Sequence, residues 1–150
     1  MRFAVVENAA GTRVVLVDPS GDRAWAVADL VPDISPEAAS DMVAFIRAWD
    51  DLRDRIRPSG AGVPLDELRL LAPFPRPRRD LICVGKNYRE HAREFTASGF
   101  DSSARSIADA VPDVPIIFAK SSGAVVGPAE PILLHPGLDA QMDYEAELGV

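Results

Sequence analysis

The chain has 150 residues, of which 47% are hydrophobic and 26% charged, enough for one medium domain or two small ones with a polar surface. A formal net charge of −7, with no extended cluster of Lys and Arg, argues against a surface that binds nucleic acid. The single cysteine excludes a disulfide framework and a cysteine-based zinc site. No signal-peptide stretch and no segment of transmembrane length is present, so we expect a cytoplasmic protein without a membrane partner.

The first half of the chain predicts three short strands followed by one long helix. Two strand-like runs at 2–7 and 12–17 flank a hairpin turn, and a third run follows at 24–27. Ser35, followed by Pro36, is a typical start of a helix. From there apolar residues recur every three or four positions and form a stripe that we expect to lie in a core: Met42, Phe45, Ile46, Trp49, Leu52 and Ile56.

A proline-rich segment marks the expected domain boundary. An extended run returns at 65–71, and the connector that follows, 73–79, contains three prolines and should be stiff. We therefore expect an N-terminal domain of strands and one helix at 1–72 and the first part of a second domain at 80–150. The predicted fold class is α+β, with mostly β structure.

The second domain should begin with a strand and a helix that carries a candidate general base. A strand-like run at 81–84 is followed by good helix formers at 88–95. On such a helix His91 and Glu94 are neighbours, so the carboxylate could fix the tautomer of the imidazole and raise its basicity. The alternative is a charged surface turn in which His91 has no chemical role.

The segments after this helix offer two further candidates. The stretch between Glu94 and Pro115 is rich in Ser, Ala, Gly and Asp, and is either a cover that orders over bound substrate or a surface loop without a role. An apolar run at 115–119 then ends at Lys120. Its ammonium could face a carboxylate or enolate oxygen of a substrate, whereas an ion pair or an exposed lysine is the alternative.

The segment 143–150 predicts a strand with two carboxylates on one face. In an extended chain Glu145 and Glu147 point the same way, and the apolar residues around them point the other way. Their Cα atoms would be roughly 6.6 Å apart, a gap that two long side chains can close around one cation. Carboxylate oxygens suit Mg²⁺ or Mn²⁺, with Ca²⁺ as a further candidate. A sheet with one face in water is the alternative.

Taken in order, these motifs resemble those of the fumarylacetoacetate hydrolase family. The strings are V-G-K-N-Y at 84–88, H-x-x-E at 91–94, F-A-K at 118–120, A-V-V-G-P at 124–128 and D-Y-E-A-E-L at 143–148. The resemblance implies that Glu145 and Glu147 bind the metal and that His91 and Glu94 are the acid/base pair. It also implies a third carboxylate ligand beyond Val150. Lys120 joins His91 and Glu94 as a candidate catalytic residue.

The resemblance implies a mixed β-roll for the second domain, a divalent cation, a homodimer and a small 2-oxo or dioxo acid as substrate. We expect a hydrolase that cleaves a carbon–carbon bond in acylpyruvate- or fumarylpyruvate-like dioxo acids, with water activated by His91 and Glu94. An isomerase or tautomerase and an oxaloacetate decarboxylase are alternatives with the same enolate chemistry. An inactive fragment or a small binding domain is the alternative from a different class.

Overall fold

The computed structural model describes residues 1–137 and 144–150. Contacts divide the chain into two units, Met1–Pro73 with Val126–Val150 and Phe74–Val125, which we describe separately. The expected domain ranges of 1–72 and 80–150 stay a prediction. Among the described residues, no helix is both long enough and apolar enough to cross a membrane.

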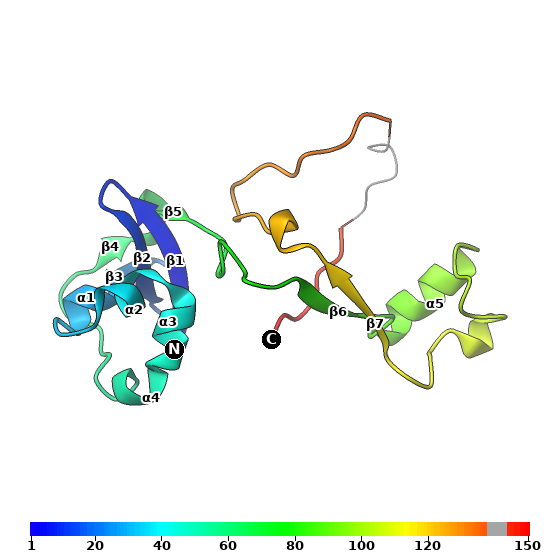
Figure 1. Ribbon diagram of the computed structural model, residues 1–150, viewed down its shortest axis with the longest axis horizontal. Coiled ribbons are helices and arrows are strands. Elements are labelled where there is room, and N and C mark those ends of the chain that lie inside the picture. The colour runs from blue at the N-terminus through cyan, green and yellow to red at the C-terminus, as the bar shows by residue number, and fades with distance from the viewer. Residues whose placement is uncertain (138–143) are drawn as a thin grey trace. The chain divides into compact units, whose positions relative to one another are not determined.

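A five-stranded antiparallel sheet of order β4-β3-β2-β1-β5 is the base of the first unit (Figure 1). Its central hairpin is in register from Arg2 opposite Val17 to Asn8 opposite Gly11. The three strands predicted from the sequence are confirmed, each to within one residue at either end. The strands are β1 (Arg2–Asn8), β2 (Gly11–Val17), β3 (Arg23–Ala26), β4 (Val63–Pro64) and β5 (Arg69–Leu70).

The chain after Ser35 forms three short helices, so the prediction of one long helix is wrong. Ser35 caps the first of them, as expected. The helix then ends before Asp41, which is extended and caps the next helix by accepting a hydrogen bond from the Ala44 amide at 2.8 Å. Aspartate side chains compete for backbone hydrogen bonds and therefore favour cap positions over helix interiors. The three helices are α2 (Pro36–Ser40), α3 (Met42–Arg47) and α4 (Trp49–Leu52), and a further short helix, α1 (Val27–Leu30), precedes Ser35.

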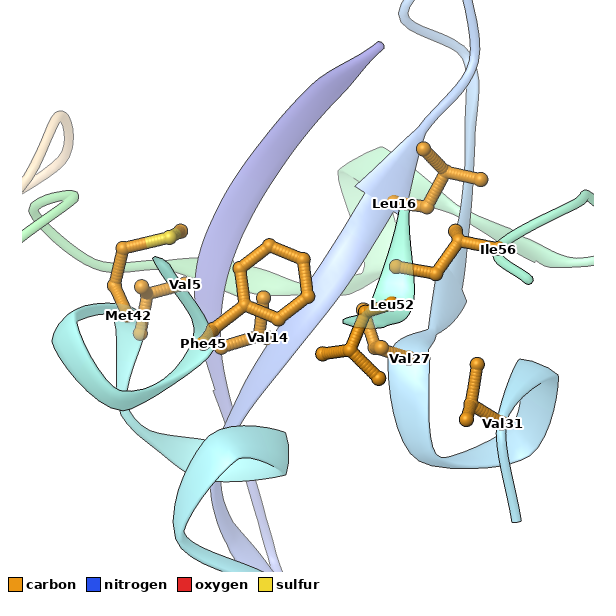
Figure 2. Close-up of a cluster of buried hydrophobic side chains, with 9 residues drawn as sticks. All are labelled: Val5, Val14, Leu16, Val27, Val31, Met42, Phe45, Leu52 and Ile56. Carbon is orange, nitrogen blue, oxygen red and sulfur yellow. The ribbon is translucent and has the colours of Figure 1, made fainter. Parts of the chain in front are cut away.

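Side chains from the sheet and the helices form the main core of this unit (Figure 2). Phe45 is 2% exposed, and its ring centroid lies 4.8 Å from that of Phe3 and 5.8 Å from that of Trp49. The predicted apolar stripe is confirmed except for Ile46, which is 53% exposed because it lies about 100° around the helix from Phe45. The buried cluster comprises Val5, Val14, Leu16, Val27, Val31, Met42, Phe45, Leu52 and Ile56.

The second unit contains an antiparallel strand pair and one helix (Figure 1). Strands β6 (Leu81–Gly85) and β7 (Ile116–Lys120) pair along their whole length, and helix α5 (Arg89–Ala97) belongs to the connection between them. Short 3₁₀ turns occur in this unit at Ile107–Asp109 and Ser122–Ala124, and in the first unit at Leu65–Glu67. Antiparallel sheets and separate helices make the chain an α+β protein, as the sequence predicts.

Replacing Phe45 with alanine should lower the free energy of unfolding by about 3–5 kcal/mol, because it removes a buried aromatic ring and leaves a cavity. The matched control is Ile46→Ala on the same helix, which should change it by less than about 0.5 kcal/mol. Urea unfolding followed by tryptophan fluorescence measures both. Equal losses in the two variants would contradict the core described here.

Candidate functional site

A sharp change of backbone direction separates strand β6 from helix α5. Lys86 follows the last residue of β6 and has a φ of 55°, in the left-handed region that residues other than glycine rarely adopt. Such a conformation costs roughly 1–2 kcal/mol, so it persists only where other contacts hold it. Those contacts come from the side chain of Lys86 itself.

Lys86 forms a buried ion pair with Asp101, in the loop that follows α5. The two side chains are only 6% and 1% exposed. The Lys86 ammonium also donates a hydrogen bond to the Ser103 hydroxyl at 2.8 Å, while the Asp101 carboxylate accepts from the Thr96 hydroxyl and, at 2.9 Å, from the Ser103 amide. We call Lys86, Thr96, Asp101 and Ser103 the clasp. A hydrogen bond from Lys86, which has the largest effect, and one from Thr96 hold the pKa of the Asp101 carboxyl well below its usual 3.8.

The candidate base lies in the middle of α5. The helix predicted at 88–95 is confirmed with bounds shifted by one or two residues, and it places Glu94 one turn after His91, where side chains are neighbours. His91 is half-buried and Glu94 is exposed. The imidazole stacks on the Phe95 ring, with centroids 6.2 Å apart and planes inclined by 15°. The same ring adjoins the clasp, because the Lys86 ammonium lies 5.9 Å from the Phe95 centroid.

Lys120 is the last residue of β7, as the sequence predicts, and its side chain is exposed. Its ammonium lies 5.9 Å from the centroid of the Phe118 ring. The turn after it is held to the start of β6, because the Ser122 amide donates a hydrogen bond to the Asp80 carboxylate at 2.9 Å. The strand pair therefore carries Lys120 at one end and the entry to α5 at the other.

Glu145 and Glu147 are exposed and lie one residue apart near the end of the chain. The prediction of a strand at 143–150 is wrong for residues 144–150, which have no regular secondary structure, and Asp143 lies outside the described residues. A strand forms where a neighbour completes its hydrogen-bond ladder, and this segment belongs to neither of the described sheets.

The two carboxylates fit a divalent cation by donor type. Carboxylate oxygens are hard ligands of the kind that Mg²⁺ and Mn²⁺ prefer. Their number is too small for a complete site, and among the described residues no three His, Cys, Asp or Glu side chains gather as metal ligands. The pair belongs to the first unit, whereas His91, Glu94 and Lys120 belong to the second.

The A-V-V-G-P motif has a packing role in the first unit. Gly127 is buried against the backbone that follows β5, and a Cβ atom added there would lie 3.2 Å from the Ala72 nitrogen and 3.3 Å from the Leu71 Cα. Its amide donates a hydrogen bond to the Glu130 carboxylate at 2.7 Å. A side chain at this position would require the neighbouring backbone to move.

Sequence reasoning missed the clasp, the most buried polar cluster of the second unit. Lys86 falls within the V-G-K-N-Y string, but its spacing from Asp101 follows no helical or strand period. The one available signal is a lysine placed directly after an apolar run and a glycine, at a point where the chain must turn.

Comparisons with known proteins agree with these motifs. Residues 80–150 match the family model described as the C-terminal domain of fumarylacetoacetate (FAA) hydrolase. The chain is 40% identical over 86 residues to oxaloacetate tautomerase YisK of Bacillus subtilis, a match that covers 57% of this chain and 25% of that protein. It is 39% identical over 119 residues to the mitochondrial oxaloacetate tautomerase FAHD2A of Bos taurus, covering 77% of this chain and 33% of the relative.

A solved structure shares the fold. The fumarylacetoacetate hydrolase of the psychrophilic Exiguobacterium antarcticum aligns with a TM-score of 0.52 at 24% identity, over 87% of this chain and 39% of that one. The chain thus spans about a quarter to a third of the length of the two curated relatives described above.

The lowered pKa of Asp101 can be measured directly by carbon-13 NMR titration of its carboxyl group. Because the folded-state pKa is lowered, the carboxylate contributes its full stability above pH about 4 and loses it as the pH falls toward the lowered pKa. We expect a midpoint well below 3.8 in the natural protein and a higher one in the Lys86→Met variant. A natural midpoint near 3.8 would show that the ion pair does not form in solution.

Proposed function

Because residues 80–150 belong to the fumarylacetoacetate hydrolase family, we propose that the full-length protein is a metal-dependent tautomerase of a small 2-oxo acid such as oxaloacetate. The observation that carries this proposal is the extent of the match to the bovine oxaloacetate tautomerase. A match over 77% of the 150 residues must include His91 and Glu94 wherever it begins. The proposal therefore applies to the segment that holds the candidate acid/base pair.

The relatives favour the isomerase alternative over the carbon–carbon hydrolase that we first expected. Both curated relatives described above are oxaloacetate tautomerases, and the likeness to a fumarylacetoacetate hydrolase structure, at 24% identity, supports the fold alone. Both activities pass through the enolate of a 2-oxo acid. In the tautomerase the enolate forms when a base removes the C3 proton, whereas in the hydrolase it is released when water adds to a second carbonyl group and the carbon–carbon bond breaks.

Proton transfer is the chemistry that the residues of α5 support. In the keto-to-enol direction a base takes a proton from C3 of the oxo acid, and the C2 oxygen gains a proton. His91 is proposed as the group that takes and returns the C3 proton, with Glu94 one helical turn away to orient the imidazole. Lys120, an exposed cation at the end of β7, is proposed to hold the substrate carboxylate.

The metal is proposed to be Mg²⁺ or Mn²⁺. Glu145 and Glu147 would hold it together with ligands outside the described residues. When bound, such a cation would polarise the C1 carboxylate and C2 carbonyl of the substrate and lower the barrier to loss of the C3 proton.

Replacing His91 with alanine should reduce kcat for oxaloacetate tautomerisation by about 10²–10⁴-fold, the usual contribution of a general base. The matched control is His135→Ala, at the only other histidine of the chain, which should leave kcat unchanged. Decay of the ultraviolet absorbance of the enol measures both. Near-normal turnover by His91→Ala would show that His91 has no chemical role and lies in a charged surface segment. Cleavage of an acylpyruvate by the natural protein would favour the hydrolase instead.

Chelation of divalent cations with EDTA should abolish the activity, and Mg²⁺ or Mn²⁺ should restore it. The single variants Glu145→Gln and Glu147→Gln should weaken Mn²⁺ binding by more than the roughly 10–100-fold that loss of an outer-shell partner costs. Isothermal titration calorimetry of the full-length protein measures this, with the exposed Glu67→Gln as control. Unchanged Mn²⁺ affinity in both variants would show that neither carboxylate binds the metal.

A further inference from the structure

The second unit has little apolar packing with which to hold its helix in place. Of residues 74–125, all of which the structure describes, only three are buried: Lys86, Ala92 and Ala110. Two of these are alanines, which contribute little apolar area. Within residues 74–125 the position of α5 therefore depends largely on polar contacts, and the clasp is the buried polar cluster that supplies them.

The clasp joins the two ends of α5. Lys86 lies three residues before the first residue of the helix, and Asp101 lies four residues after the last. Thr96, in the last turn, bonds to Asp101 and also to the Ala92 carbonyl at 2.9 Å. The chain from 86 to 101 is thus closed into a loop by side chains, with His91 near its middle.

A continuous set of contacts leads from the clasp to the candidate base. The Lys86 ammonium pairs with Asp101 and lies over the Phe95 ring, and that ring stacks on the imidazole of His91. A cation over an aromatic face is attracted by the ring, more strongly where water is excluded. Movement of Lys86 would therefore disturb the Phe95 ring and the imidazole of His91 that stacks on it.

We propose that Lys86 and Asp101 are positioning residues, which hold α5 and the Phe95 ring so that His91 keeps the orientation that proton transfer requires. Only the kinetic part of this inference rests on the proposed function. The left-handed backbone of Lys86 supports it, because a strained conformation at the entry to a helix persists only when its surroundings over-determine it. Neither residue touches the substrate in this scheme.

The test compares Asp101→Asn and Lys86→Met with a matched control in the full-length protein. The control is Asp109→Asn, an exposed aspartate of the same loop whose contact is with the Ser106 hydroxyl at 3.0 Å. Hydrogen exchange measured by mass spectrometry reports how firmly α5 is held. Steady-state kinetics on oxaloacetate report whether His91 is correctly placed.

Loss of either partner should speed amide exchange in α5 by at least about tenfold. It should also lower kcat by about 10²-fold while KM changes by less than about twofold, because misplacement of a catalytic group acts on the transition state. Lys86→Arg, which keeps the charge, should restore most of kcat, and Asp109→Asn should match the natural protein. This combination would not arise from a general loss of stability.

If a single variant fails to fold, the double variant Lys86→Met/Asp101→Asn gives the same readouts, since it leaves no unpaired charge buried. Natural exchange in α5 together with natural kcat in the variants would overturn the inference, as would faster exchange with unchanged kcat, or equal effects from Asp109→Asn. Absence of tautomerase activity in the natural protein would instead refute the proposed function, and the exchange rates would still decide whether the clasp holds α5.

Discussion

The buried ion pair between Lys86 and Asp101 is the contact on which the second unit depends. Two opposite charges that are 6% and 1% exposed remain stable only as partners, because removal of one leaves the other buried and uncompensated. The pair fixes where the chain leaves β6 and where it resumes after α5. Helix position, the Phe95 ring and the His91 imidazole follow from it through direct contacts. Within residues 74–125 this helix has few buried apolar side chains, so the polar contacts of the clasp are its main buried support.

Much of the fold could be predicted from the sequence because its signals are local. Alternating apolar residues predicted β1 and β2, and the spacing of Met42, Phe45 and Leu52 predicted the helical face that lines the core. The helix breaks could not be predicted in the same way. The apolar stripe begins only at Met42, and whether the aspartate before it lies inside a helix or caps a new one depends on tertiary packing.

The candidate site could be predicted in part, for a different reason. His91, Glu94, Lys120, Glu145 and Glu147 were identified by the order of short motifs, and the structure confirms the helix and the strand end that carry the first three. The strand expected around the two glutamates needs a partner that a local pattern does not identify. The clasp could not be predicted for a related reason, because an ion pair between residues fifteen positions apart follows no helical or strand period in the sequence.

We propose that the full-length protein moves the C3 proton of a 2-oxo acid without breaking a carbon–carbon bond. Proton NMR of oxaloacetate in deuterium oxide, with the protein and Mg²⁺, tests it most directly. We expect protein-dependent loss of the C3 proton signal while the oxaloacetate remains intact, and this exchange should be lost when His91 is replaced. Formation of pyruvate at the rate of exchange, or no exchange above the rate without protein, would contradict it.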